Sequence, residues 1–304
     1  MQRVVKGLIM KAISWLLIFT LFFYLTALIC SIPRNLRITN VDGKLVSTYS
    51  LRDIVNFTSM NLKEIYSGNL SDTFKGKNQK EILIVKLQKT SILLGCGILL
   101  GIIFGILKGI FDSRRTKGKD SYLKVLLTII PISMPDMLNI ALLQMFALWL
   151  IRNGIKVFKV AGQGTVAHMI LPVIALSILP TVYIARVTAL SIESCYNTDY
   201  VKAAIGKGCS KTRILWNHVM RNALGIISEG MSNMTAMIIC NLLIVEFMFS
   251  YMGLAVSLVQ FFQNRDSIGM ITIILMIGAV YFILDNIFQL LKKITYRAAR
   301  EGSI

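Results

Sequence analysis

Long apolar segments constrain this chain more than any other feature of its sequence. A helix needs about 20 residues to cross the roughly 30 Å of hydrocarbon in a bilayer. Stretches of that kind lie at roughly 8–30, 91–111, 123–150, 166–190, 224–249 and 268–291. In lipid each one must satisfy its own backbone hydrogen bonds, so helices are the expected form. The sequence therefore predicts an all-α polytopic membrane protein with about six transmembrane helices.

The basic residues predict how these helices are oriented. A net charge of +18 is compatible with nucleic acid or with a membrane surface, and its distribution decides between them. Lys and Arg gather at the N-terminus and at 113–120, 199–223 and 292–300. These are both termini and alternate loops, which the positive-inside rule places in the cytoplasm. We expect cytoplasmic N- and C-termini, contact with membrane lipid, and no nucleic-acid partner.

The first apolar segment resembles a signal peptide because Arg3, Lys6 and Lys11 precede it. The apolar run extends to about Cys30, well beyond the 7–15 residues of a signal core, and no small-residue cleavage site follows it. We expect it to be retained. The predicted organisation is an N-terminus and first transmembrane helix at 1–30, an external polar region of short helix and loop at 31–90, a five-helix transmembrane core at 91–291 with a cytoplasmic loop at 191–223, and a basic cytoplasmic tail at 292–304.

Glycines and prolines mark how the predicted spans pack. Gly95, Gly97, Gly101, Gly105 and Gly109 in the second span include small residues four apart, which permit close approach of two helices. The general abundance of glycine in membrane helices is an equally good explanation. Four prolines are predicted to kink the third and fourth spans. They are Pro131, Pro135, Pro172 and Pro180.

Few side chains in this sequence could carry out chemistry. The five cysteines are scattered without a C-x-x-C spacing, and there are two histidines, His168 and His218. Neither a zinc site nor a disulfide framework is indicated. The chain also lacks the G-x-x-x-x-G-K-[ST] loop that cradles nucleotide phosphates. We expect no catalytic residue, no metal site and no cofactor in this chain.

A charged island, Asp199–Gly208 followed by a basic stretch, separates two apolar segments. Thr198 or Asp199 is suited to cap a short helix, and Gly208 to end it in the left-handed conformation. A second helix is expected to start near Ser210. An ordinary amphipathic interfacial loop is the plain alternative. A DNA-reading helix-turn-helix is disfavoured, because spans on both sides pin this segment to the membrane.

The faces of these two helices are predicted from residue spacing. Tyr200, Ala203 and Ala204 lie three to four residues apart and form a small-plus-aromatic face that fits a groove in a partner. In the second helix the apolar side chains are expected to pack against the bundle. They are Ile214, Leu215 and Val219.

The island resembles the cytoplasmic coupling loop of ABC importer permeases, and most closely that of first-subunit permeases of the dipeptide/oligopeptide/nickel family. The resemblance rests on Asp199-Tyr200-Val201, Ala204 and Lys207-Gly208, and then on His218 and Arg221–Leu224. Further matching pieces are Ser67–Leu70, His168–Pro172, Glu246–Ser250 and Gly253-Leu254. The chain departs from the family pattern at Cys209 and at Met252, which stands where the family has proline.

The resemblance implies a type I ABC importer permease fold with a cytoplasmic coupling helix, in a bacterial cytoplasmic membrane. This chain would form half of a pathway and would work with a second homologous permease, two cytoplasmic ABC ATPases that bind ATP and Mg²⁺, and an extracellular solute-binding protein. The substrate stays open between dipeptide, oligopeptide, nickel and a metal chelate. The residues expected to couple the chain to the ATPases are Asp199, Tyr200, Val201, Ala203, Ala204, Lys207 and Gly208.

Polar side chains within apolar spans call for an explanation, because a central charge costs about 2.5–3.5 kcal/mol on insertion scales. We hypothesise that four of them face a wet path for a polar solute. They are Asp136, Asn139, Asn233 and Asn241. Interhelical hydrogen bonding is the alternative. Glu246 is predicted either to contact a partner permease or binding protein, or to make a local contact at a helix end.

A stand-alone channel or secondary transporter is the competing class. It would need intramembrane charges coupled to an ion and an inverted internal repeat. The sequence shows no convincing repeat, so an importer subunit is the favoured interpretation.

Overall fold

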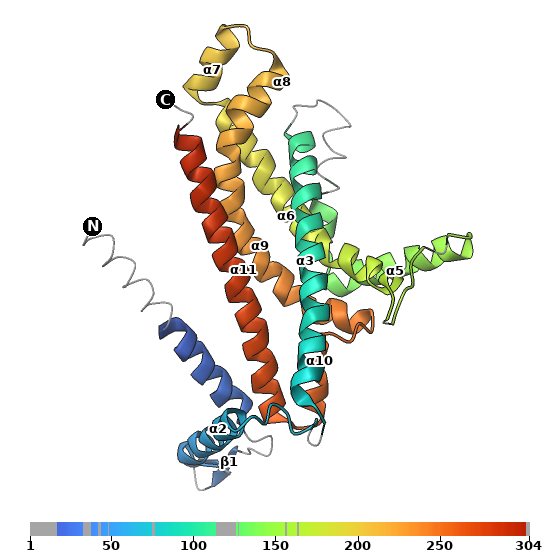
Figure 1. The fold of residues 1–304 in the computed structure, drawn as a ribbon, viewed down its shortest axis with the longest axis vertical. Coiled ribbons are helices and arrows are strands. Elements are labelled where there is room, and N and C mark those ends of the chain that lie inside the picture. Colours follow the sequence, from blue (N-terminus) through green and yellow to red (C-terminus); the bar gives the residue numbers. More distant parts are fainter. Residues whose placement is uncertain are drawn as a thin grey trace, which may run out of the picture. The chain divides into compact units, whose positions relative to one another are not determined.

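The computed structural model describes residues 17–32, 38–41, 44–47, 49–74, 77–113, 126, 128–155, 157–162 and 164–301 (Figure 1). The predicted basic N-terminus and most of the basic 113–120 loop lie outside the described residues. The chain forms two compact units. Unit 1 contains residues 1–85 and 257–278, and unit 2 contains residues 86–256 and 279–304.

Long apolar helices dominate the structure, which confirms the predicted helical membrane fold. Among the residues that the structure describes, four helical stretches are long and apolar enough to cross a membrane: Gln79–Asp112, Val166–Tyr196, Lys211–Met248 and Ser267–Arg297. Shorter apolar helices cover Leu17–Cys30 and Leu254–Gln263. The principal elements are α2 (Leu51–Tyr66), α3 (Gln79–Asp112), α5 (Asp136–Arg152), α6 (Ile170–Tyr196), α9 (Met220–Met248), α10 (Leu254–Gln263) and α11 (Ser267–Glu301).

Two predicted borders fall inside continuous helices. The border at 90/91 lies within α3, and the border at 291/292 lies within α11. The 34 residues of α3 extend about 50 Å at 1.5 Å per residue, well beyond the hydrocarbon thickness. Polar residues at the ends of these helices therefore continue the helix instead of breaking it.

The third predicted span, 123–150, is wrong as one continuous helix. The chain is helical at 128–133, leaves the helix at Met134 and Pro135, and starts again as α5 at Asp136. Pro135 has no N–H to donate to the carbonyl of Pro131, four residues earlier. The Asn139 Nδ2 donates to that carbonyl instead, at 2.9 Å. One amide side chain thus satisfies the acceptor that the proline leaves open.

Unit 2 is assembled around a close contact between α3 and α6. Every fourth residue of α3 from 97 to 109 is a glycine, and each one packs against α6. A Cβ built on Gly97 would lie 3.2 Å from Leu176, and one on Gly101 would lie 2.8 Å from Pro180. A Cβ on Gly105 would lie 2.7 Å from Ile184, and one on Gly109 would lie 2.5 Å from Thr188. The partners on α6 are also four residues apart. These four glycines therefore serve close helix packing, whereas Gly95 has open space around it.

The two prolines of α6 have different positions. Pro180 lies inside the helix, where it is buried and faces Gly101. Pro172 lies in the first turn, where its missing N–H has no intrahelical acceptor to satisfy. The kink predicted at Pro172 is therefore not required, because a proline there is compatible with a regular helix start.

Helix α9 packs against α6 on one side and makes polar contacts with α11 on another. Lys292 Nζ lies 2.7 Å from Glu229 Oε1, and the Tyr296 hydroxyl donates to the other oxygen of Glu229 at 3.3 Å. The ring of Tyr296 lies 3.6 Å from a Cβ built on Gly225. These contacts hold the C-terminal part of α11 beside the first half of α9.

In unit 1, α2 packs where two apolar helices end. Ala27 and Cys30 form a buried cluster with Ile271 of α11, and Leu62 and Ile65 of α2 pack against it. A capping box starts α2: the Asp53 N–H donates to the Ser50 hydroxyl, and the Ser50 N–H donates to the Asp53 carboxylate.

A β-hairpin precedes α2, in a region predicted to be short helix and loop. Strand β1 (Ile38–Val41) pairs antiparallel with β2 (Lys44–Ser47), with Val41 opposite Lys44. The sequence between the strands is Asp-Gly, the dipeptide most typical of two-residue hairpin connections. The alternation around this dipeptide was the signal that could have identified the hairpin.

Asp266 connects the start of α11 to the segment after α2. Its buried carboxylate accepts hydrogen bonds from the Ser71 hydroxyl at 2.6 Å, the Thr73 N–H at 2.8 Å and the Gly269 N–H at 2.7 Å. Burial raises the pKa of Asp266, but these hydrogen bonds outweigh burial and hold the pKa below its usual range. Its stabilising contribution is therefore present above the ordinary aspartate pKa and is lost as the pH falls through the lowered value.

We predict opposite effects of one methyl group at two glycines of α3. Gly95→Ala and Gly105→Ala both gain helix propensity of roughly 1 kcal/mol. Only the methyl at 105 meets backbone and side-chain atoms of α6, and overpacking costs about 1–3 kcal/mol. The apparent unfolding temperature of the purified protein in one detergent should fall for Gly105→Ala and not for Gly95→Ala. Equal unfolding temperatures for the two variants would contradict the close α3–α6 packing.

Candidate functional site

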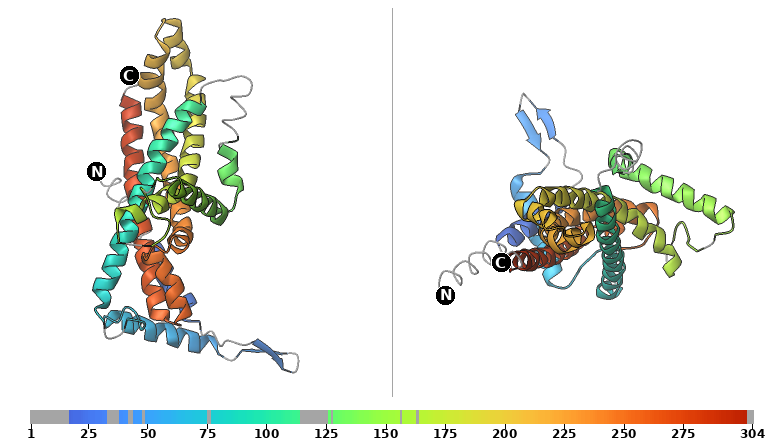
Figure 2. Two further views of the ribbon diagram at one scale, coloured as in Figure 1. Left: turned by 90° about the vertical axis from the view of Figure 1, so that its right-hand side faces the viewer. Right: turned by 90° about the horizontal axis from the view of Figure 1, so that it is seen from above.

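The charged island forms a helical platform at one end of the α6–α9 pair (Figures 1 and 2). It consists of α7 (Asp199–Gly206), α8 (Lys211–Arg213) and a π-helical segment, η2 (Ile214–Val219), that leads into α9. The expected short helix, glycine break and second helix near Ser210 are confirmed. The Ser210 hydroxyl accepts a hydrogen bond from the Arg213 N–H at 3.4 Å and so caps α8.

The ends of α7 differ in how they are capped. Thr198 occupies the N-cap position, but its hydroxyl donates to the Cys195 carbonyl at 2.5 Å and makes no cap bond. Asp199 supplies negative charge to the first turn and pairs with Lys202 at 3.1 Å. At the other end Gly208 has a φ of +76°, and the Gly208 and Cys209 N–H groups bond to the carbonyls of Ile205 and Ala204. This is a Schellman motif, as the glycine predicted.

The two faces of α7 are now distinguished by burial. Val201 is 0% exposed and Ala204 is 7% exposed, on the side where α7 packs against η2 with its buried Ile214 and Val219. Both side chains are covered by this chain itself, so they do not form an exposed partner face in this structure, and their role in coupling stays a prediction. The remaining predicted coupling residues are exposed: Asp199, Tyr200, Ala203, Lys207 and Gly208.

Tyr200 also takes part in a contact inside the platform. Its hydroxyl accepts a hydrogen bond from Asn222 Nδ2 at 2.7 Å, and the same Nδ2 lies 3.2 Å from the His218 carbonyl. Asn222 belongs to the first turn of α9, so this bond connects α7 directly to α9. Asn222 was not among the predicted site residues, although it lies in the Arg221–Leu224 motif.

The segment η2 changes the register of the helix between platform and span. The Met220 N–H bonds to the carbonyl of Leu215, five residues earlier, as in a π-helix. Such segments occur frequently at functional sites. Trp216 on η2 is 56% exposed and Ile205 on α7 is 54% exposed, so the platform presents large apolar side chains as well as small ones.

The four hypothesised pathway residues are not brought together as one lining. Asp136 is the first residue of α5 and lies beside the break at Pro135, not at mid-helix, because the proline starts a new helix there. Asn139 is used locally, on the Pro131 carbonyl. On α9, Asn233 is exposed and lies 3.2 Å from the Tyr183 hydroxyl, whereas Asn241 is 5% exposed. Among the described residues, none of the four hydrogen-bonds to another.

Asn241 has an unusual environment for an amide. Its Oδ1 is buried without a hydrogen-bond partner among the described residues. An unpaired buried carbonyl of this kind costs about 1–3 kcal/mol. The structure therefore favours neither the wet path nor interhelical hydrogen bonding for this oxygen.

Glu246 forms a buried, fully hydrogen-bonded group of unit 2. Its side chain is 0% exposed, near the end of α9. One carboxylate oxygen accepts the Thr90 hydroxyl of α3 at 2.6 Å, and the other accepts the Val256 N–H of α10 at 2.9 Å. The Ala255 N–H also donates to the carboxylate. A negative charge at the first turn of α10 is favourable because the helix dipole is positive there.

These contacts correct one prediction and explain one motif. A contact of Glu246 with a partner permease or binding protein is wrong, because this chain covers the carboxylate completely. The local helix-end contact is the one observed. A Cβ on Gly253 would lie 2.1 Å from Glu246 Oε1 and 2.6 Å from Thr90 Oγ1, so only glycine permits this approach. The Leu254 N–H donates to Thr90 Oγ1 at 2.7 Å and completes the network.

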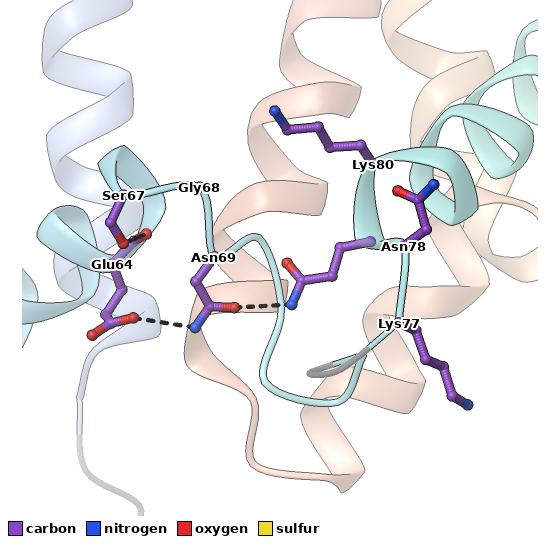
Figure 3. Close-up of a pocket in the computed structure, with 8 residues that line it drawn as sticks. Glu64, Ser67, Gly68, Asn69, Lys77, Asn78 and Lys80 are labelled. Carbon is purple, nitrogen blue, oxygen red and sulfur yellow. Dashed lines mark hydrogen bonds between the residues drawn. The ribbon is translucent and has the colours of Figure 1, made fainter.

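An open cavity of about 450 Å³ lies in unit 1, between the end of α2 and the start of α3 (Figure 3). Its amide side chains bond to one another and to nearby groups. Asn69 donates to Glu64 at 3.3 Å and accepts from Gln79 at 3.1 Å, and Asn78 donates to Glu81 at 2.8 Å. The cavity residues thus mainly order the segment between α2 and α3.

No metal centre is present among the residues that the structure describes, in the sense that no group of three or more His, Cys, Asp and Glu side chains could hold an ion. His168 Nδ1 lies 2.7 Å from the Thr165 hydroxyl, so this histidine has a local partner.

Long apolar helices joined at one end by an exposed helical platform define a multi-pass membrane protein. The family described as "Binding-protein-dependent transport system inner membrane component" matches residues 97–295, and this chain belongs to that family. The chain is therefore a transmembrane permease subunit of an ABC importer.

Individual relatives agree with this assignment. The chain is 28% identical over 208 residues to the dipeptide transport system permease protein DppB of Bacillus subtilis, an alignment that spans 64% of this chain and 66% of that protein. It is 25% identical to DppB of Lactococcus lactis over 76% of this chain and 74% of that protein. It is 26% identical to the peptide transport system permease protein SapB of Salmonella typhimurium over 70% of this chain and 73% of that protein.

A solved structure supports the fold. The structure titled as inward-facing conformations of the MetNI methionine ABC transporter aligns with a TM-score of 0.57 and 13% identity. The alignment covers 71% of this chain and 97% of that chain. At this identity the likeness concerns the fold of the helical core.

We predict that Glu246→Ala destabilises the protein strongly. The substitution leaves the Thr90 hydroxyl and the N–H groups of Ala255 and Val256 without their acceptor, and each buried unpaired donor costs about 1–3 kcal/mol. Phe247→Ala is the matched control, because this neighbouring side chain is 56% exposed. The folded yield and the apparent unfolding temperature should fall well below those of the control. Values equal to the control would contradict the anchoring role.

A second prediction concerns the bond between Tyr200 and Asn222. We expect Tyr200→Phe to lower the apparent unfolding temperature slightly, because one hydrogen bond contributes about 0.5–1.5 kcal/mol. In an Asn222→Ala background Tyr200→Phe should have no further effect, since the bond is already absent. Tyr196→Phe, at an exposed tyrosine of α6, is the control. Additive effects of the two substitutions would show that the residues act independently.

Proposed function

We propose that this chain is one half of the membrane pathway of a peptide-class importer and that its platform docks a cytoplasmic ATPase. The observation that carries the proposal is the exposed face of α7, held rigidly on α9 at the end of two long apolar helices. The similarity to permeases named for dipeptide and peptide transport supports a peptide as substrate. Nickel or a metal chelate, the other substrates of the resembled family, has no support among these relatives.

The proposed assembly contains further subunits. A second homologous permease completes the pathway, two cytoplasmic ABC ATPases bind ATP and Mg²⁺ and hydrolyse the nucleotide, and an extracellular solute-binding protein delivers the substrate. The platform then lies on the cytoplasmic side, with both termini of the chain. This orientation is supported by the basic residues of the platform and of the C-terminal stretch 292–300.

The proposed mechanism is alternating access. Closure of the ATPases moves α7, and α7 moves α9 because buried Val201 and Ala204 and the Tyr200–Asn222 bond join the two elements. Rigid-body movement of packed helices then exposes the pathway to one side of the membrane or the other. No residue of this chain needs to react chemically in this scheme.

The exposed and buried sides of α7 provide a sharp test, because Ala203 is exposed and its neighbour Ala204 is buried. Ala203→Asp places a carboxylate on the exposed face, so the variant should fold and insert normally but lose co-purifying ATPase and peptide uptake. Ala204→Asp places the same carboxylate against η2, so it should lower the yield of folded chain itself. Co-purification with tagged ATPase, size-exclusion profiles and uptake of labelled peptide measure these outcomes.

Two results would contradict the proposal. Retention of ATPase and of uptake by Ala203→Asp would show that the exposed face of α7 is not the docking surface. Peptide uptake by the chain reconstituted alone would favour the stand-alone transporter class over an importer subunit.

A further inference from the structure

Helix α2 exposes apolar side chains that the rest of unit 1 does not cover. Leu51 is 83% exposed, Val55 is 46% exposed and Tyr66 is 96% exposed. At 3.6 residues per turn these three side chains project within about 60° of one another. A stripe of this kind on a surface helix indicates contact with an apolar environment.

Between the exposed residues, and on the side next to them, α2 is fixed at the level where apolar helices end. Leu62 and Ile65 pack against Ala27, Cys30 and Ile271, which belong to the apolar helix Leu17–Cys30 and to α11. Asn61 Nδ2 donates to the Ser31 hydroxyl at 2.8 Å, just beyond Cys30. Since both apolar helices are membrane segments, α2 is held beside the edge of the hydrocarbon layer.

The charges of α2 follow a regular order around the helix. Going around the helix from the packed side, the exposed apolar stripe comes first and Arg52 and Lys63 come next to it. Asp53 and Glu64 lie on the far side, about 90–100° beyond the basic pair. Two exposed apolar side chains border this acidic pair, Met60 at 61% and Phe57 at 39%. Around α2, the side packed on protein is thus followed by an apolar side, a basic side and an acidic side. A helix that lies between hydrocarbon, lipid phosphates and water meets its surroundings in this order.

We propose that α2 is an interfacial helix that rests on the outer leaflet and anchors unit 1 to the lipid surface. Leu51, Val55 and Tyr66 enter the boundary between headgroups and acyl chains, about 5–10 Å deep. Arg52 and Lys63 reach the lipid phosphates, with their aliphatic stems along the apolar stripe. Tyr66 occupies the headgroup level, where aromatic side chains of membrane proteins concentrate.

Lipid fits this surface better than a protein partner does. The helix Leu17–Cys30, against which α2 packs, itself exposes Leu21, Leu25 and Ile29, at 60%, 47% and 64%. The apolar surface of α2 therefore continues an apolar surface of a membrane helix. A docking site for a soluble protein would not require a basic row placed between the apolar stripe and the acidic side.

Tryptophan scanning tests the proposal. Val55→Trp and Leu51→Trp, in the full chain within its purified complex, are reconstituted into phosphatidylcholine–phosphatidylglycerol vesicles. Some vesicles carry bromine near the headgroup end of the acyl chains and others near the chain terminus. We expect loss of the added fluorescence, relative to the parent chain with its three tryptophans, mainly with the shallow bromines. Asn56→Trp is the matched control on the polar side and should keep its fluorescence.

Several results would overturn the proposal. Equal quenching at 55 and 56 would show no preferred side, and stronger quenching by the deep bromines would show insertion instead of surface contact. An unquenched Val55→Trp whose emission shifts when soluble solute-binding protein is added would identify a protein-docking face. An unquenched and unchanged Val55→Trp would exclude lipid contact. All readouts are independent of transport, so they hold whether or not the proposed substrate is correct.

Discussion

Helices inside a bilayer gain little from burying apolar surface against one another, because lipid is as apolar as a leucine side chain. Close van der Waals contact and buried hydrogen bonds must hold them together instead. In this chain α3 uses both. Its glycines at 97, 101, 105 and 109 contact α6 almost backbone to backbone, and Thr90 near its other end bonds to Glu246 of α9. The arrangement of α3, α6 and α9 therefore depends on one helix with two kinds of contact.

Helix α9 connects the two most specific sites of unit 2. From the platform at Met220 to Glu246 this 29-residue helix extends about 39 Å. At one end α7 is joined to it by a hydrogen bond and by buried side chains, and at the other end α10 starts on its carboxylate. In the proposed function this helix transmits movement, because one of its ends is bonded to α7 and the other to α10.

The features that the sequence predicted correctly are local ones. Twenty apolar residues, a helix start near Ser210 and a glycine at 208 act within a few residues of themselves, so their structural consequences follow from chemistry alone. For the glycines of α3, the four-residue spacing predicted close helix packing, but it did not identify α6 as the partner helix. The break at Pro135 was predicted as a kink, and its completeness depends on Asn139 replacing a backbone donor.

The features that the sequence did not predict depend on distant partners or on backbone register. Glu246 and Thr90 are 156 residues apart in the chain, so no local pattern shows that this carboxylate is buried. The burial of Ala204 depends on η2, and nothing in ILWNHV distinguishes a π-helical segment from an α-helical one. A face of α7 derived from spacing alone includes Ala204, because positions 200, 203 and 204 project within about 100° of one another around the helix. Burial divides that face between this chain and its surroundings, and only the outer half, with Tyr200 and Ala203, remains free to meet another subunit.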